Sequence, residues 1–334
     1  MIVPSFISNS DTRMTAKNWG RIWLAAFLVV VVVMGAWEFY WRGKGFFPSV
    51  NDDLNLWSLT RSKISPKTKV AFAGSSRIQM GLHPDVFKQK LGIVPVNLSV
   101  DGNPPYPVIY DLAGDVSFKG TLIVSFTPRW LGESDPKKSR ASKWVRKHKK
   151  KTLLSKVDTY LAVAVQKTFA FRYSGLSISK IRSKLERGLA PIPTYAPLRF
   201  DRYRQGLFTP ENTPRILAAR TKRERMFAKK ARPVTEKGFE ERIEALNKAI
   251  AKIRKRGGDV LFLRLPTSGP MLEIETALWP RQKYWGVFEK KISAKIIHFA
   301  DHDSLKSFTC PDGSHMGLED ARRYTERLLE MIKL

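Results

Sequence analysis

Residues 69–77 read KVAFAGSSR, and they hold the strongest indication of how the chain folds. Its apolar residues stop at Gly74, and an apolar run that ends at a glycine predicts a buried strand. Ligands of open α/β sheets bind at the carboxyl ends of the strands, which is where the serines follow. A serine there, before a helix, has backbone N–H groups beside its hydroxyl, as acyl-transfer nucleophiles do. Ser76 is therefore a candidate nucleophile, and the alternative is an ordinary turn.

Further strands and helices alternate along the chain. Apolar runs predict four more strands: residues 94–100, 121–126, 260–266 and 294–299. Helices are predicted within residues 78–91, 107–114, 236–256 and 318–334, the first of them short and preceded by a turn. This alternation is typical of an α/β fold in which helices cover both faces of a parallel sheet.

The charge of the chain is strongly unbalanced. Its 334 residues include 59 lysines and arginines against 30 acidic residues, a formal net charge of +29. Such a balance indicates an anionic partner, either nucleic acid, an acidic membrane surface or a polyanionic glycan. Nucleic acid is the least favoured, because the sequence has no helix-turn-helix, zinc-finger or RNP pattern and carries a predicted membrane anchor. The single cysteine, Cys310, excludes an internal disulfide.

Residues 22–41 predict a transmembrane anchor. They read IWLAAFLVVVVVMGAWEFYW, and about 20 apolar residues span the core of a bilayer. Glu38 is the one charge in the run, and it lies near the end among aromatic residues typical of a membrane interface. The alternatives are a cleaved signal peptide and a buried soluble helix. The run is long for a signal peptide, no small-residue cleavage site follows it, and a run of valines is unusual in a soluble helix.

Charges beside the anchor favour a cytoplasmic N-terminus. Arg13, Lys17 and Arg21 precede the anchor, and Arg42 and Lys44 follow it. The positive-inside rule then places residues 1–21 in the cytoplasm as a tail. The main domain, residues 68–334, is expected on the other side of the inner (cytoplasmic) membrane, in the periplasm of a single-pass protein. Residues 42–67 are polar and contain Gly, Pro, Asn and Asp, which predicts a linker or docking segment.

A basic insertion interrupts the α/β pattern at about residues 132–235. It holds 27 lysines and arginines against 7 acidic residues. We expect it to be partly helical, with residues 157–170 forming a buried or membrane-lying helix and the proline-rich residues 190–197 not helical. Three interpretations of its charge remain: a solvated face, a surface against anionic lipid headgroups, and a groove for a polyanionic glycan.

A second motif, Asp312-Gly313-Ser314-His315, lies before the last predicted helix. An aspartate three residues before a histidine can accept a hydrogen bond from its Nδ1–H, which leaves the other ring nitrogen free as a general base. The alternative is a turn in which the aspartate caps backbone N–H groups. A metal site that uses His298 and His302 is disfavoured, because strand and loop placement spreads the four ligands it needs. No metal or other cofactor is expected.

The turn after the second predicted strand supplies two further candidates. Gly102 lets a backbone N–H approach a ligand closely, and Asn103 offers a side-chain amide donor. Together with the Ser76 N–H, these groups would form an oxyanion hole. The alternative is a loop glycine in a turn that is ended by proline.

These motifs resemble the SGNH (GDSL-like) hydrolase superfamily in order and context. Ser76 stands at the nucleophile position of the first block, Gly102 in the second block, and Asp312 and His315 in the last. The resemblance implies a three-layer, flavodoxin-like sheet and covers about residues 68–130 and 236–334. One block departs from the family: residues 127–130 read TPRW, where the family has a Gly-x-Asn-Asp asparagine in the oxyanion hole. Asn103 is the expected substitute.

The resemblance implies a membrane-anchored serine esterase or O-acyltransferase that acts on a cell-envelope glycan or other anionic polymer. It also implies a partner, because anchored proteins of this kind work beside a multi-spanning membrane O-acyltransferase. Two alternatives stay open. The chain would be a non-catalytic SGNH-like scaffold or polymer-binding subunit, or a surface-binding protein in which the motifs match by coincidence.

Overall fold

Five parallel strands form the sheet that positions the candidate site. The computed structural model of the chain describes residues 16–132, 138–150, 152–332 and 334. The strands are β1 (Val70–Ala73), β2 (Val96–Asn97), β3 (Thr121–Ser125), β4 (Asp259–Arg264) and β5 (Lys295–His298). They lie in the order β2-β1-β3-β4-β5, and each neighbouring pair is parallel. The carboxyl ends of all five strands therefore share one edge, and the predicted α/β class is confirmed.

The observed strands are shorter than the apolar runs that predicted them, and β2 differs most. It covers two residues, Val96 and Asn97. The chain nevertheless continues beside β1, because the Leu98 N–H donates to the Phe72 carbonyl (2.8 Å) and the Val100 N–H to the Gly74 carbonyl (2.9 Å). This extended stretch brings the loop with Gly102 alongside the turn that follows β1.

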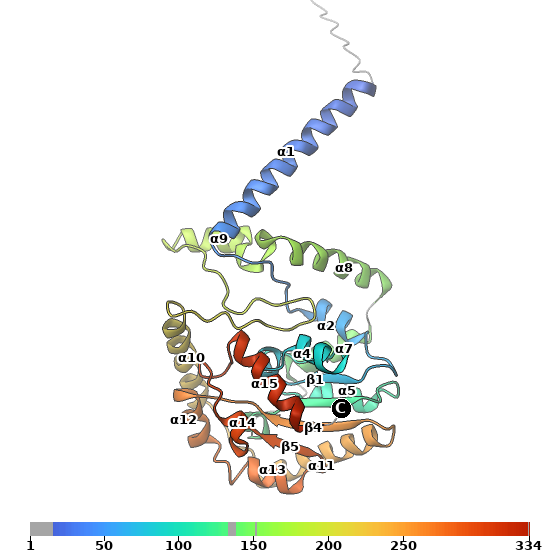
Figure 1. Ribbon diagram of the computed structural model, residues 1–334, viewed down its shortest axis with the longest axis vertical. Helices are drawn as coiled ribbons and strands as arrows, with labels where there is room; N and C mark the ends of the chain where they lie inside the picture. Colours follow the sequence, from blue (N-terminus) through green and yellow to red (C-terminus); the bar gives the residue numbers. More distant parts are fainter. Residues whose placement is uncertain (1–15, 133–137, 151, 333) are drawn as a thin grey trace, which may run out of the picture.

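Side chains of the strands point alternately into two buried clusters, one on each face of the sheet. Ala71 and Leu122 belong to the cluster with α5, α11 and α13, whereas Phe72 and Ile123 belong to the cluster with α3, α4 and α15. These helices are α3 (Ser76–Gly81), α4 (Pro84–Leu91), α5 (Tyr106–Gly114), α11 (Glu236–Arg254), α13 (Trp285–Lys291) and α15 (Leu318–Met331). Helices thus cover both faces of the sheet (Figure 1).

The segment of residues 42–67 is part of the domain rather than a free linker. It contains α2 (Leu54–Arg61), whose first turn is capped by the Asp53 side chain. Trp57 of α2 is fully buried in the main core, and its indole N–H donates to the Leu98 carbonyl at 2.9 Å. The docking alternative therefore replaces the linker prediction, because α2 buries three apolar side chains, Leu56, Trp57 and Leu59, and contacts β2.

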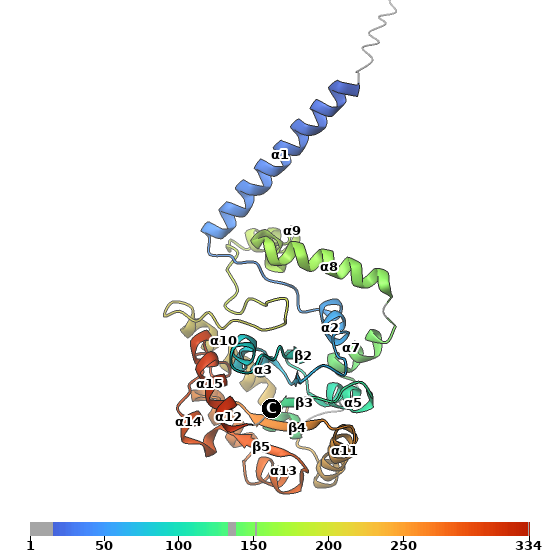
Figure 2. The ribbon, with the colours of Figure 1, turned by 45° about the vertical axis from the view of Figure 1, so that its right-hand side comes forward.

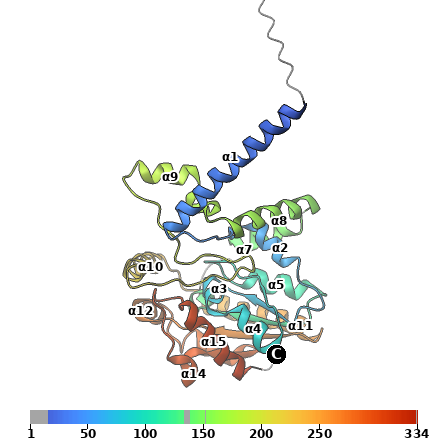
Figure 3. The same ribbon diagram turned by 45° about the horizontal axis from the view of Figure 1, so that its top comes forward.

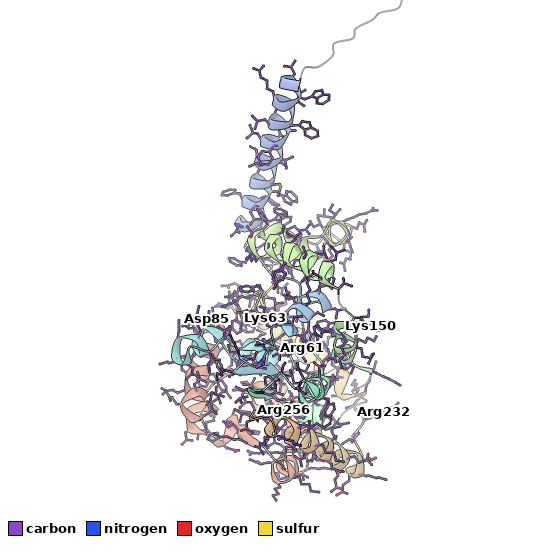
Figure 4. The ribbon with its side chains drawn as sticks, turned by 90° about the vertical axis from the view of Figure 1, so that its right-hand side faces the viewer. Arg61, Lys63, Asp85, Lys150, Arg232 and Arg256 are labelled. Carbon is purple, nitrogen blue, oxygen red and sulfur yellow. The ribbon has the colours of Figure 1, made fainter. Side chains whose placement is uncertain are left out.

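Two arginines join α5 to its neighbouring helices. Arg61 of α2 donates to Asp111 Oδ2 (2.6 Å) and Asp115 Oδ2 (2.8 Å). Arg256, which follows α11, donates to the carbonyls of Ala113 (3.0 Å) and Leu112 (3.1 Å) at the other side of α5 (Figure 4). These contacts fix the position of α5, and the N-terminal end of this helix lies beside the candidate site.

Helix α1 (Ala16–Gly43) extends away from the domain (Figure 2). Within the described residues it is the one helix that is long and apolar enough to cross a membrane. It begins before the predicted anchor and includes the last residues of the predicted tail, whereas residues 1–15 of that tail lie outside the described part. The side of the membrane on which the domain lies stays a prediction.

The basic insertion between β3 and β4 is partly helical, as predicted. Its helices are α7 (Arg140–His148), α8 (Leu153–Thr168), α9 (Ile178–Leu185) and α10 (Thr213–Ala228), with short turns η2 (Ala170–Arg172) and η3 (Ser174–Leu176). Residues 190–197 are not helical. The insertion is integrated into the fold, because the fully buried Arg202 bonds the carbonyls of Asn97 (2.8 Å) and Ser99 (2.7 Å) and the carboxylate of Asp52.

We predict that Trp57→Ala lowers the free energy of unfolding by about 3–5 kcal/mol, the usual cost of truncating a large buried aromatic side chain. Trp57→Phe is the control, because it keeps most of the apolar volume and loses only the hydrogen bond to Leu98. Denaturant unfolding of the full chain in detergent would measure both. Equal stability of Trp57→Ala and the wild type would contradict the docking of residues 42–67.

Candidate active site

A tight turn between β1 and α3 presents Ser76 at the carboxyl edge of the sheet. β1 ends at Ala73, and α3 begins at Ser76. Gly74 between them has φ +148, and a Cβ atom there would lie 3.0 Å from side-chain atoms of both Ile78 and Ser125. Only glycine fits this close approach between the turn, its own helix and the end of β3. The sequence therefore needs Gly74 to place the serine hydroxyl at the sheet edge.

The second motif forms a turn in which one carboxylate has two tasks. Asp312 Oδ1 accepts hydrogen bonds from the N–H groups of Ser314 (2.9 Å) and His315 (2.7 Å). Asp312 Oδ2 lies 2.8 Å from His315 Nδ1. Gly313 makes the turn possible with φ +81. The capping and the orienting interpretations of this motif are thus both realised, by different oxygens of the same side chain.

The structure brings the two motifs together. His315 Nε2 lies 2.8 Å from Ser76 Oγ, and His315 Nδ1 lies 2.8 Å from Asp312 Oδ2. Ser76 and His315 are 239 positions apart in the sequence. Asp312 and His315 are 0% and 3% exposed, whereas the serine is partly accessible. The arrangement has the connectivity of a serine nucleophile, a general base and an orienting carboxylate.

Burial and charge set the protonation of this pair. Burial lowers the pKa of His315 below its ordinary 6.5, and the positive charge of Arg220 adds to this effect, although Asp312 opposes it. Burial alone would raise the pKa of Asp312, but attraction to His315, their hydrogen bond and Arg220 together hold it well below its usual range. A neutral imidazole beside an ionised carboxylate is the state in which a general base operates.

Arg220 was not anticipated from the sequence. It belongs to α10 of the basic insertion, and its Nε lies 3.1 Å from Asp312 Oδ2. Tyr195, also from the insertion, has its hydroxyl 3.5 Å from the same oxygen. No short sequence pattern places an insertion residue at the motif 92 positions later, so this contact had no local signal. The insertion therefore helps to build the site.

A pocket of about 360 Å³ opens beside the serine. Ser76, Gly102 and Thr127 all line it. Its wall is otherwise polar and aromatic, and it also contains the following residues: Ser75, Arg77, Asp101, Arg129, Trp130, Arg220, Arg223, Glu224, Phe227, Met271, Glu275 and Ser314. Residues that follow β1, β2 and β3 thus meet residues of α10 and α12 (Gly269–Leu278) at one edge of the sheet.

Of the two predicted oxyanion-hole residues, Gly102 lines this pocket and Asn103 does not. Gly102 lines it with φ +64, and within the described part of the chain its N–H has no hydrogen-bond acceptor. The Asn103 side chain does not line the pocket. Its Nδ2 donates to the Asp101 carbonyl (2.8 Å), and its Oδ1 accepts from the Ala141 N–H (3.3 Å). The structure therefore does not bring Asn103 to the serine as predicted.

Thr127 is a polar residue of this pocket that the sequence motifs did not point to. It follows β3, is 5% exposed and lines the pocket. Among the described residues, no hydrogen-bond partner is found for its hydroxyl. A usable signal was its position, because Thr127 begins the residues that stand where the SGNH pattern has Gly-x-Asn-Asp.

A cluster of buried charged side chains joins the two turns that form the site. Arg77, the residue after the serine, forms an ion pair with Glu275 of α12. Arg264 of β4 pairs with the other carboxylate oxygen of Glu275. The Arg77 guanidinium also donates to Ser314 Oγ at 3.1 Å, next to His315. All three charged side chains are buried, so the cluster ties the nucleophile turn to the histidine turn.

Comparison with known proteins adds no assignment to this geometry. No protein-family model matches the chain, and a search of curated proteins finds no relative. Among the described residues, no group of three His, Cys, Asp or Glu side chains is arranged to hold a metal ion.

Proposed function

We propose that the protein is a serine esterase or O-acyltransferase with an SGNH-type site in a three-layer, SGNH-like domain. The observation that carries this proposal is the chain of contacts from Ser76 Oγ through His315 to Asp312. It joins two motifs from opposite ends of the domain, in a pocket and at the edge of the sheet where ligands bind in α/β folds. Coincidental matches would have no reason to meet with this geometry.

The residues have defined roles in the proposed reaction. Ser76 Oγ attacks the acyl carbonyl carbon while His315 Nε2 takes the hydroxyl proton. The tetrahedral intermediate collapses when His315 returns that proton to the leaving oxygen, so an alcohol departs and an acyl-enzyme remains. Water or a sugar hydroxyl then attacks the acyl carbon and gives its proton to His315 Nε2; the bond to Ser76 Oγ breaks as His315 returns that proton to the serine, which releases the acid or the acylated sugar. Asp312 keeps His315 oriented and stabilises the imidazolium that forms in each half-reaction.

The negative oxygen of the intermediate needs donors in the pocket. The backbone N–H groups of Ser76 and Gly102 are two proposed donors, because both residues line the pocket. The Thr127 hydroxyl is the proposed third donor, in place of the family's asparagine and of Asn103. A hydroxyl at this position can rotate toward the oxyanion, and it has no competing partner among the described residues.

The proposed substrate is an anionic cell-envelope polymer or glycan. Arg129 and Arg223 line the pocket, and within the described part of the chain Arg223 has no acidic partner within ion-pair distance. An apolar helix long enough to span a membrane precedes the domain, which supports action at a membrane surface. Location in the inner membrane with the domain in the periplasm, and cooperation with a multi-spanning O-acyltransferase, belong to the same proposal.

A non-catalytic, polymer-binding scaffold is the second candidate. The observation that favours it is that no asparagine among the described residues lines the pocket, and that both polar ends of the Asn103 side chain are already bonded. The scaffold needs the basic surface and the anchor but not an activated serine. The first experiment below separates the two candidates.

We expect full-length protein in detergent to react covalently with a fluorophosphonate probe at Ser76. Ser76→Ala removes the labelling, and His315→Ala slows it by roughly 10²–10⁴-fold, the usual contribution of a general base. Ser75→Ala is the matched control and keeps the labelling, because the hydroxyl within hydrogen-bond distance of His315 Nε2 belongs to Ser76 and not to Ser75. Folded wild-type protein that does not react, or labelling that persists in Ser76→Ala, would contradict the enzyme proposal.

The labelling rate also has an expected pH dependence. Only neutral His315 can accept the proton, so the rate falls as the pH drops through the pKa of His315. Burial lowers this pKa, so the midpoint lies below 6.5. Arg220→Gln removes a positive charge that disfavours the imidazolium, and it therefore moves the midpoint to higher pH. Arg223→Gln, which changes a pocket arginine that does not contact Asp312, is the control; a downward shift in Arg220→Gln would contradict the assignment.

If the Thr127 hydroxyl donates to the oxyanion, two substitutions of this residue should differ in their effect on kcat. Thr127→Val keeps the shape of the side chain but removes the hydroxyl, and we expect kcat for p-nitrophenyl acetate to fall ~10²–10³-fold. Thr127→Ser restores a hydroxyl and keeps most of the activity. Unchanged kcat in a folded Thr127→Val protein would show that Thr127 does not stabilise the intermediate.

A further inference from the structure

Helix α8 presents an apolar face that no described residue covers. Its exposed apolar side chains have 40–78% of their surface accessible: Leu153, Leu154, Val157, Tyr160, Leu161 and Val165. Soluble proteins seldom leave a helix face of this kind open to water. The sequence predicted a buried or membrane-lying helix at residues 157–170, and the structure excludes the buried alternative, since Thr159 is the one buried residue of α8.

The apolar face is opposite the face with which α8 packs on the domain. Thr159 and Val163 point inward, and Val163 packs against the cluster of Val50, Leu56 and Leu198. Helix α8 contacts α2 on this inner side. The exposed residues follow the same helical spacing half a turn away, and Figures 1 and 3 show α8 on the side of the domain from which α1 extends. The uncovered face of α8 therefore lies on the side of the domain where α1 would enter a membrane.

Helix α1 is fixed to the C-terminal end of α8. Glu38 of α1 accepts hydrogen bonds from the N–H groups of Ala170 (2.9 Å) and Phe171 (3.2 Å). Arg42 donates to the Thr168 carbonyl (2.9 Å) at the end of α8. Trp41 packs with Ala170 in one small buried cluster. The direction of α1 relative to α8 is therefore set by side-chain contacts and not by a free hinge.

Exposed aromatic side chains and positive charges lie near the junction of α1 and α8. Trp37 and Tyr40 are exposed at the C-terminal end of α1, and such residues concentrate where a membrane meets water. Residues 153–188, which include α8 and α9, hold seven lysines and arginines against two acidic residues. Ile178 and Leu185 of α9 are also exposed among these cations. Apolar side chains flanked by cations match the boundary of an anionic bilayer.

We propose that α8 lies in the membrane interface, with its apolar face at the boundary between lipid headgroups and acyl chains and with the cations of α9 on anionic headgroups. The domain would then rest on the membrane at two places, α1 and α8, which fixes its orientation to the bilayer. This proposal does not depend on the chemistry of Ser76. It commits to lipid as the occupant, because α8 continues the surface that α1 already places at a membrane.

Site-specific labelling of the full chain tests the proposal. Cys310 is buried, and burial raises its pKa to about 12, so introduced cysteines would be labelled selectively. Leu154→Cys and Leu161→Cys place an NBD fluorophore on the outer face of α8, and Lys248→Cys on α11 is the water-exposed control. In vesicles of phosphatidylcholine and phosphatidylglycerol, we expect blue-shifted emission at positions 154 and 161. Spin-labelled lipid acyl chains should quench these two probes and leave position 248 unchanged.

Two results would overturn the proposal. Water-like emission at positions 154 and 161 without quenching would show that the face stays in solvent. Blue-shifted emission without lipid quenching, together with cross-linked dimers through the cysteines, would show that a second copy of the chain covers the face. Circular dichroism of each variant before reconstitution verifies that the helix content is retained.

Discussion

One buried carboxylate holds the two halves of the candidate site together. Glu275 lies between the guanidinium groups of Arg77 and Arg264, and all three side chains are buried. A carboxylate without partners in this position would be strongly destabilising, because removal of one partner from a buried ion pair costs about 3–5 kcal/mol. Through Arg77 and its hydrogen bond to Ser314, the cluster fixes the relative position of the nucleophile turn and the histidine turn.

Other buried or half-buried arginines have the same function elsewhere in the chain. Arg202 anchors the basic insertion beneath β2, Arg61 joins α2 to α5, and Arg220 brings α10 to Asp312. Guanidinium groups suit such joints, since each offers several donors in one plane and keeps its charge when buried. Part of the excess positive charge of the sequence therefore serves internal contacts. The exposed remainder, which includes α9 and the basic residues of α7, is the part available to an anionic surface.

The candidate site and the proposed membrane contact are linked through the insertion. Its first half, with α8 and α9, lies at the end of α1, and its second half, with α10, forms one wall of the pocket. A single segment between β3 and β4 thus connects the end of α1, where the membrane contact is proposed, with the pocket that contains Ser76. In the proposed enzyme, this connection would hold the pocket at a set distance from lipid and from polymer at the membrane surface.

Much of the fold could be predicted, because its signals are local. Apolar runs marked all five strands, and the spacing of Phe239, Ile243 and Leu246 marked α11. The apolar helix α1, long enough to cross a membrane, the candidate nucleophile and the Asp312–His315 pair were also recognisable from short patterns. Each of these features depends on neighbours within a few positions, where side-chain period and backbone chemistry leave little freedom.

Local patterns of residues set which elements form and which residue types stand at the ends of the strands. Tertiary structure alone decided which of them meet: Asn103 turns to Ala141, Thr127 faces the pocket, and Arg220 reaches Asp312. It also decided that Trp57 is buried and that the outer face of α8 is not. The physical reason is that these outcomes depend on contacts between positions far apart in the chain. Their energies arise only when the sheet has closed and burial makes each unpaired polar group costly.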